Sequence, residues 1–209
     1  MRVREVVSVM GATGTGKSTK LRELLSPHKR VMVIDPVLDH TWEAKGFLRV
    51  HTLQEMSRAM AYGWHSGFRC VLTPEDGEVA LHAASSLLFR YSERLGRQQL
   101  ALAVDEMTEC YSTAHAMRAK FQGFKEAILQ GRHINLSIYG ATQRPQDVAT
   151  RFRDNALHAF FFALHDDAAR QAVLRKIGRE HAKTFLGLKD FEYLEWYRGL
   201  VKVGKTRGA

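Results

Sequence analysis

The sequence lacks long hydrophobic runs and has few cysteines. No stretch of about 18 consecutive apolar residues occurs, so we expect no transmembrane helix. The N-terminus is basic and then apolar, but its apolar part is only residues 6–10 and leads directly into a glycine-rich loop. A buried strand therefore fits it better than a signal peptide. Cys70 and Cys110 lie far apart in no metal-type spacing, which fits a reducing compartment.

Other signatures are also missing. The ten histidines form no H-x-x-E-H or H-E-x-x-H pattern, so the sequence predicts no zinc site. We find no internal repeat, low-complexity tract or linker. With 209 residues and 45% hydrophobic content, the chain is long enough for one sizeable core. We expect a single domain over residues 1–203 and a loose basic tail over residues 204–209.

The chain carries an excess of positive charge, with a formal net charge of +9 and a pI near 9.8. One interpretation is an ordinary surface rich in lysine and arginine. The other is a polyanionic partner, most simply nucleic acid. Charge alone does not decide between them.

Apolar, β-branched runs alternate with segments of helical spacing, which predicts an α/β fold. Continuous apolar strands joined by helices are typical of a mostly parallel sheet covered on both faces. Residues 192–204 alternate between apolar and polar, as an antiparallel edge strand or hairpin would. The other strands are expected at residues 3–10, 30–35, 68–73, 99–106, 136–143 and 158–164.

A phosphate-binding loop follows the first strand. Residues 11–19 read GATGTGKST and fit the pattern G-x-x-x-x-G-K-[ST]. The glycines let the backbone N–H groups and the following helix N-terminus surround phosphate oxygens. Lys17 is expected to reach the β- and γ-phosphates, and the Ser18 hydroxyl to help hold Mg²⁺. The predicted ATP-binding residues are Gly11, Ala12, Thr13, Gly14, Thr15, Gly16, Lys17, Ser18 and Thr19.

Two acids end the apolar strand LALAVDE, residues 100–106. Asp105 is expected at the carboxyl edge of the sheet, where it can coordinate Mg²⁺. Glu106 is expected to polarise the attacking water as general base, although an acid there can also simply complement a helix N-terminus. We expect the strand at residues 68–73 to separate the loop strand from the acidic strand. That arrangement is typical of RecA-like (ASCE) P-loop NTPases.

Gln143 ends a further apolar strand, so its side chain is expected near the γ-phosphate, where it can sense that group. The alternative is a glutamine that only caps the strand. The surrounding sequence YGATQRPQDV resembles the sensor strand of the FtsK–HerA superfamily of DNA-translocating ATPases. The three motifs occur in that superfamily's order between residues 11 and 148, and VIDP at residues 33–36 resembles its second strand. Residues 166–188 and the closing edge strand resemble its usual end.

This resemblance implies roles for individual residues. Lys17 and Ser18 would bind phosphate and Mg²⁺, Asp105 would bind the metal, Glu106 would be the catalytic base and Gln143 the sensor. Arg132 corresponds to an arginine that reaches the neighbouring subunit's site and neutralises transition-state charge. Arg144 is the rival for that role, and Arg132 can also be an ordinary helix C-terminal cation.

We expect the sequence to hold little more than a motor core, and that size resembles the genome-packaging ATPases of tectivirus-like icosahedral viruses with an internal membrane. The resemblance implies a homo-oligomeric ring, expected to be a hexamer, that pumps double-stranded DNA past capsid vertex proteins. Such a protein would occur in the host cytoplasm during assembly and in the virion. The ring would grip the phosphate backbone without reading bases. Candidate contacts, each equally explained as ordinary surface, are Arg118, Lys120, Arg151 and Arg153.

Three alternatives remain open at this stage. The first is a cellular or plasmid HerA/FtsK-like DNA-processing ATPase. The second is a nucleotide kinase-type phosphotransferase, which would need neither Glu106 nor an arginine from a neighbour. The third is a slow, ATP-binding structural protein of a capsid vertex.

Overall fold

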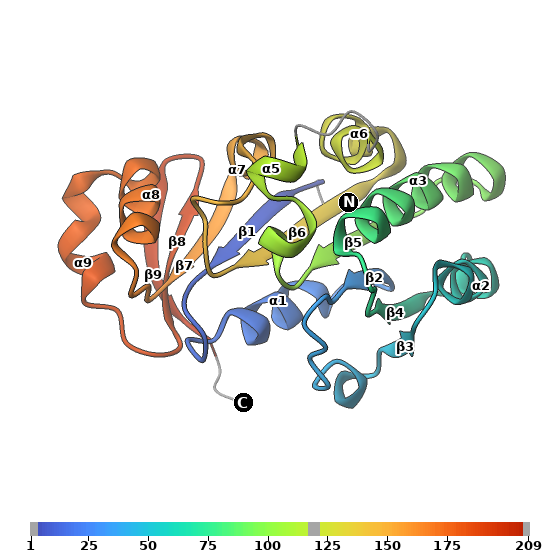
Figure 1. The fold of residues 1–209 in the computed structure, drawn as a ribbon, viewed down its shortest axis with the longest axis horizontal. Coiled ribbons are helices and arrows are strands. Elements are labelled where there is room, and N and C mark those ends of the chain that lie inside the picture. Colours follow the sequence, from blue (N-terminus) through green and yellow to red (C-terminus); the bar gives the residue numbers. More distant parts are fainter. Residues whose placement is uncertain (1–3, 117–121, 207–209) are drawn as a thin grey trace.

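The computed structural model describes residues 4–116 and 122–206, so the candidate DNA contacts Arg118 and Lys120 lie outside the described residues. Within those residues, one nine-stranded sheet has the order β3-β4-β2-β5-β6-β1-β7-β8-β9. All nine strands, from the first to the last of the described chain, belong to this one sheet (Figure 1). Its strands are β1 Val6–Met10, β2 Arg30–Ile34, β3 Leu48–Val50, β4 Phe68–Leu72, β5 Leu100–Val104, β6 Leu136–Thr142, β7 His158–Phe162, β8 Glu192–Tyr197 and β9 Leu200–Lys205.

The expected sheet type is confirmed. Every pairing from β3 across to β7 is parallel, whereas β8 pairs antiparallel with β7 and with β9. The central strands β1, β2, β5 and β6 are buried along their whole length. Most of their residues are apolar on both faces because helices or loops cover both sides of the sheet, which explains the long apolar runs in the sequence.

Helix α1 lies on one side of the sheet, and α3 and α6 lie on the other (Figure 1). The apolar side chains of β1 divide accordingly: Val7 and Val9 join the cluster that contains Leu21 and Leu25 of α1, whereas Val6 joins the cluster under α3 and α6. The helices of the described chain are α1 Lys17–Leu25, α2 Leu53–Gly63, α3 Gly77–Leu95, α4 Met107–Cys110, α5 Thr113–Ala116, α6 Gly123–Gln130, α7 Thr150–Asn155, α8 Asp167–Ile177 and α9 Ala182–Leu186, with short 3₁₀ turns at Glu43–Lys45, Gly131–Ile134 and Arg179–His181.

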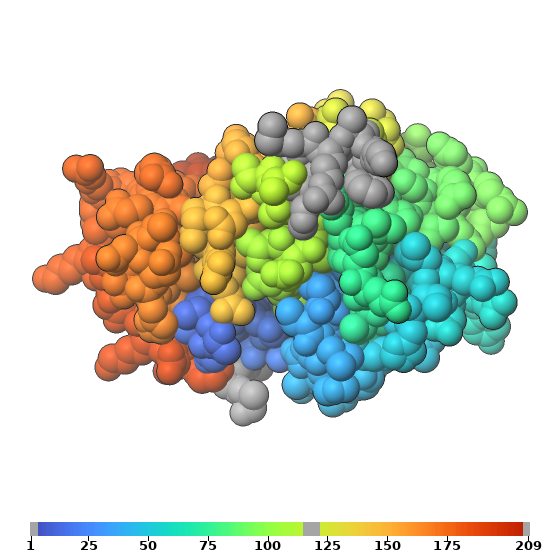
Figure 2. All heavy atoms as spheres, viewed as in Figure 1, coloured from blue at the N-terminus to red at the C-terminus, as the bar shows by residue number. Residues whose placement is uncertain are grey.

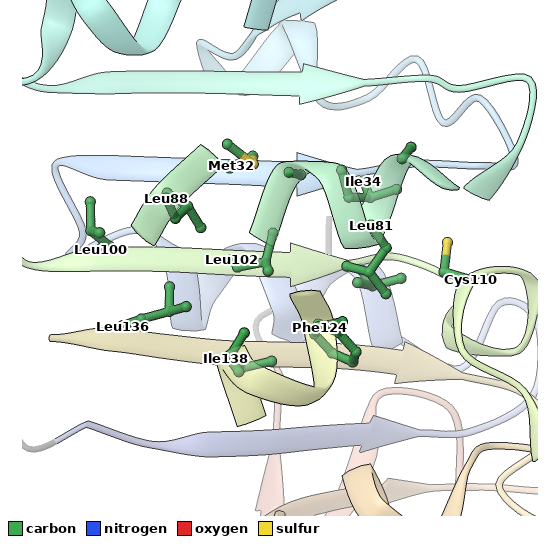
Figure 3. Close-up of a cluster of buried hydrophobic side chains, with 14 of the residues drawn as sticks. Met32, Ile34, Leu81, Leu88, Leu100, Leu102, Cys110, Phe124, Leu136 and Ile138 are labelled. Carbon is green, nitrogen blue, oxygen red and sulfur yellow. The ribbon is translucent and has the colours of Figure 1, made fainter. Parts of the chain in front are cut away.

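The largest core cluster fills the space between α3, α6 and the central strands (Figure 3). Leu81 and Leu88 of α3 and Phe124 of α6 pack on alternate residues of β2, β5 and β6. Gly123 allows the two helices to approach, since a Cβ there would contact the His82 carbonyl and the Ser86 hydroxyl of α3. This packed layer covers β5 and β6, which pair side by side and are followed directly by Asp105–Glu106 and by Gln143.

One expectation about the sheet was wrong. The strand predicted at residues 68–73 is β4, and it lies beyond β2, away from the loop strand. The strand that separates β1 from the acidic strand β5 is β6, which ends at Gln143. The error has a simple cause: strand position in the chain does not fix strand position in a sheet built from crossover connections.

Parallel strands place all their carboxyl ends at one edge of the sheet. The segments that follow β1, β2, β5, β6 and β7 therefore emerge together. On the face seen in Figure 2, the blue atoms of the early chain border the gold atoms that follow β6 and the yellow-green atoms that follow β5. No described helix is both long enough and apolar enough to cross a membrane.

Candidate active site

The loop between β1 and α1 makes a tight turn that depends on its glycines. Gly14 and Gly16 have φ values of 78° and 107°, in the left-handed region that only glycine adopts without strain. Gly11 is needed for space instead: a Cβ there would lie 2.5 Å from the Cβ of Phe162. The loop backbone is held by the strands on both sides of β1, with Gly11 N–H donating to the Thr142 carbonyl at 3.2 Å and Ala12 N–H to the Ala163 carbonyl at 2.8 Å.

The C-terminal hairpin also contacts this loop. Phe191, just before β8, has a φ of 66° and donates its N–H to the Thr15 carbonyl at 2.9 Å. Thr206, just after β9, donates its N–H to the Phe191 carbonyl at 2.9 Å and is buried. The ring of Phe191 and the hydroxyl of Thr206 lie close enough to Gly16 that they would touch a Cβ there. The two ends of the hairpin thus brace the loop from outside the nucleotide motifs.

Lys17 begins α1 and points back over the loop. Its Nζ donates to the Ala12 carbonyl at 2.9 Å, and the side chain is largely buried. Burial lowers the pKa of Lys17, while the nearby Glu106 and Asp105 carboxylates oppose that shift. A buried ammonium group at this loop would attract a phosphate, which would replace the Ala12 carbonyl as its partner.

Ser18 and Asp105 come together from α1 and from the end of β5. The Ser18 Oγ donates to the Asp105 Oδ1 at 3.3 Å, and the Trp42 indole N–H donates to Oδ2 at 3.0 Å. Burial raises the pKa of Asp105 to about 6, although the Trp42 hydrogen bond acts in the opposite direction. Two adjacent hard oxygen atoms at a phosphate loop are the donors that Mg²⁺ prefers, so the residues fit that ion.

Glu106 and Gln143 meet beside the loop. The Glu106 Oε1 accepts from the Thr108 hydroxyl at 2.7 Å, and its Oε2 accepts from the Gln143 backbone N–H at 3.3 Å. The Gln143 Oε1 accepts from the Thr13 hydroxyl at 2.8 Å. The three sequence motifs are therefore joined by hydrogen bonds at the edge of the sheet.

A hollow of about 510 Å³ opens next to these residues. Its wall includes Glu106, the predicted general base, and residues that follow β6. The hollow is therefore open space directly beside the residue that is predicted to activate water. Arg144 is exposed on this wall, at the same edge of the sheet as the phosphate loop. The hollow is lined by Val37, Glu106, Thr108, Glu109, Ser112, Gln143, Arg144 and Asp147.

Arg132 is not brought to this site. It lies in the 3₁₀ turn Gly131–Ile134, which precedes β6, and so stands at the amino edge of the sheet, opposite the phosphate loop. Its side chain is exposed and lies near Arg4, whose pKa it helps to lower after the larger effect of burial. Of the candidate DNA contacts on α7, Arg151 is exposed, whereas Arg153 donates to the Pro145 carbonyl at 3.3 Å.

Comparison by sequence finds no matching protein-family model and no matching curated protein. Comparison by structure finds many similar chains. The genome packaging NTPase B204 from Sulfolobus turreted icosahedral virus 2, in complex with AMPPCP, superposes with a TM-score of 0.75 over 99% of this chain and 100% of its own, at 20% identity. VirB4 of Thermoanaerobacter pseudethanolicus gives 0.69 over 100% and 91%, at 11% identity. EccC of Thermomonospora curvata, with a signal sequence peptide, gives 0.59 over 96% and 37%, at 15% identity.

The chain therefore shares the fold of these structures, which include the genome packaging NTPase and VirB4. Within this fold, two residues at the site were not found from the sequence. Trp42 has no motif around it, and only the Asp-Pro that ends β2 hints that the segment after it approaches the edge. No sequence pattern indicates that Phe191 lies at the site. Its left-handed backbone and its hydrogen bond to Thr15 depend on how the C-terminal hairpin packs.

Proposed function

We propose that this chain is an ATP-hydrolysing motor that translocates double-stranded DNA, and that it packages a viral genome into a preformed capsid. The observation that carries the proposal is the hydrogen-bonded junction of Thr13, Gln143 and Glu106 on a fold similar to a genome packaging NTPase. This junction connects the phosphate loop to a carboxylate and to a sensor group.

In the proposed reaction, the loop N–H groups and Lys17 bind the β- and γ-phosphates, and Ser18 and Asp105 would hold Mg²⁺. The ion would neutralise charge on the phosphate oxygens when bound. Glu106 then accepts a proton from the attacking water. Gln143, which touches both the loop and Glu106, changes partner when the γ-phosphate leaves and so reports its loss along β6.

Translocation of DNA is supported by charge. The net charge of +9 favours a polyanion, and Arg151 offers an exposed cation on α7. We further propose a head-to-tail ring in which Arg132 or Arg144 of one subunit completes its neighbour's site. Residues 1–203 would act as a single ATPase domain, since one sheet runs through the described part of that range.

The proposal can be tested by measuring ATP hydrolysis against protein concentration, with and without double-stranded DNA. We expect the rate per subunit to rise with concentration and with DNA, and to be abolished by Lys17→Ala. DNA affinity should fall steeply as salt increases, because phosphate contacts release counterions. Hydrolysis independent of both concentration and DNA would refute the motor, and phosphate transfer to a nucleotide acceptor would identify a kinase.

A second candidate is an ATPase that moves polypeptide. It is favoured by the similarity to EccC, whose structure is in complex with a signal sequence peptide. This candidate predicts that DNA leaves the ATPase rate unchanged while an unfolded or signal-type peptide raises it. The same assay therefore separates the two, with the DNA-free rate as the common baseline.

A further inference from the structure

The segment between β2 and β3 approaches the phosphate loop and inserts one tryptophan beneath it. Trp42 is fully buried and packs with Leu21 and Leu25 of α1. Its ring also contacts Phe47 edge to face, with centroids 5.0 Å apart. The apolar part of the side chain is thereby fixed on several sides, and only the indole N–H needs a polar partner.

That partner is the metal-binding carboxylate of the proposed nucleotide site. The indole N–H donates to the Asp105 Oδ2 at 3.0 Å, while the Ser18 hydroxyl donates to Oδ1 at 3.3 Å. The two oxygens of Asp105 are thus distinguished: Oδ1 faces the phosphate loop and Oδ2 faces the core. A tryptophan can only donate, so this contact favours an ionised carboxylate in one rotamer.

The segment that carries Trp42 is itself held at several points. Arg49 on β3 donates to the Asp35 Oδ2 at 3.1 Å, to the Glu43 Oε1 at 2.6 Å and to the Asp39 carbonyl at 2.8 Å. On the other side, Arg22 of α1 pairs with the Asp39 carboxylate at 3.3 Å. These contacts flank Trp42 in the chain and hold the segment that carries it from both sides.

We propose that Trp42 is a positioning residue for the metal site: its indole N–H fixes the Asp105 carboxylate so that Oδ1 stays beside Ser18, ready for Mg²⁺. The inference rests on the proposed nucleotide function. When Ser18 turns its oxygen to the ion, the Trp42 N–H is the side-chain donor that Asp105 retains among the described contacts. Removing a group that orients a metal ligand typically lowers metal affinity 10- to 100-fold.

The chain provides a matched control. Trp64 is also fully buried, and its indole N–H donates to the Gly96 carbonyl at 3.0 Å, far from the carboxyl edge of the sheet. Trp42→Phe and Trp64→Phe therefore remove the same donor at the same hydrogen-bond length. The binding of ADP is measured by calorimetry in EDTA and again in Mg²⁺. In EDTA, we expect Trp42→Phe to bind ADP with the wild-type affinity. The factor by which Mg²⁺ increases the affinity for ADP should be at least tenfold smaller in Trp42→Phe than in the wild type. Trp64→Phe should match the wild type in both conditions.

A second measurement covers the case in which Trp42→Phe does not fold. The three indole N–H signals of the wild-type chain are assigned by NMR from Trp64→Phe and Trp196→Phe. We expect Asp105→Asn to shift the Trp42 indole signal and to leave that of Trp64 in place.

The outcomes are distinguishable. If Trp42→Phe gains as much from Mg²⁺ as Trp64→Phe does, or if Asp105→Asn leaves the Trp42 signal unmoved, the inference is overturned. If the wild-type chain gains nothing from Mg²⁺ and hydrolyses no ATP, the proposed function fails instead, and the NMR comparison still tests the contact between Trp42 and Asp105.

Discussion

Replacing Gly11 with alanine should disable the phosphate loop while the chain still folds. A Cβ at this position would lie 2.5 Å from the Cβ of Phe162 and 2.8 Å from the Thr15 Oγ1. Carbon atoms in contact are about 3.5 Å apart, so the loop and β7 would have to separate by about 1 Å. The backbone bonds from Gly11 to Thr142 and from Ala12 to Ala163 oppose that movement.

Overpacking of this kind typically costs about 1–3 kcal/mol. If the strain is relieved by moving the loop, the nucleotide dissociation constant should rise about 5- to 150-fold. Binding of ADP with Mg²⁺ measured by calorimetry gives that ratio, and urea unfolding of the same samples shows whether the fold is retained.

Gly199→Ala is the matched control. Gly199 lies in the turn of the β8–β9 hairpin at the opposite edge of the sheet, with a φ of 91° and nothing within 4 Å of the position that a Cβ would take. Alanine there should lower the free energy of unfolding by about 1–2 kcal/mol through backbone strain alone and leave nucleotide affinity unchanged. Wild-type affinity in Gly11→Ala, or an equal loss in Gly199→Ala, would refute the steric reasoning.

Three further predictions address the site and the fold. Glu106→Gln should bind ATP as the wild type does but hydrolyse it about 10²- to 10⁴-fold more slowly in a single-turnover assay, and undiminished turnover would exclude Glu106 as the base. Arg132→Ala should bind ATP and lose hydrolysis, and mixing it with Glu106→Gln subunits should restore some activity; a mixture as inactive as its components would contradict a role in the neighbouring site. Burial lowers the pKa of His158, but hydrogen bonds to Glu5 and Glu195 outweigh that effect and raise it. The protonated imidazole therefore stabilises the folded chain. This stabilisation is complete below about pH 6.5, the pKa of an unperturbed histidine, and is lost as pH rises through the raised pKa. Urea unfolding across that range should therefore show a steeper loss of stability in the wild type than in His158→Gln, and parallel pH profiles would contradict the assignment.

The sequence was enough to bring together those parts of the candidate site in which a local motif coincides with a strand end. The loop at residues 11–19, the acids after β5 and the glutamine after β6 each follow an apolar run, and parallel pairing is enough to bring such ends to one edge. The order of the strands in the sheet could not be predicted from the sequence. A crossover connection places β6 between β1 and β5, and no local sequence pattern indicates where such a connection places its strand.

Residues that act through packing were missed for a related reason. Trp42 reads as one more aromatic residue in a polar segment, and its contact with Asp105 spans 63 positions of the chain. The short strand β3, which carries Arg49, is only three residues long and has no periodicity to detect. Such residues are defined by tertiary contacts, so a reading based on spacing cannot find them.

The geometry of β6 limits what Arg132 can do. Arg132 stands just before this strand and Gln143 just after it, and the strand between them has seven residues. At about 3.3 Å per residue, the two ends are roughly 23 Å apart, several times the reach of an arginine side chain. Arg132 therefore cannot serve the nucleotide site of its own chain, and any bound nucleotide that it contacts must belong to a neighbour whose carboxyl edge faces this amino edge. Because one buried strand joins Arg132 to Gln143, a neighbour that engages the arginine would be mechanically connected to the proposed sensor residue of this chain. Arg144 has no such separation from its own site, so an effect of Arg144→Ala that is independent of assembly would distinguish the two arginines.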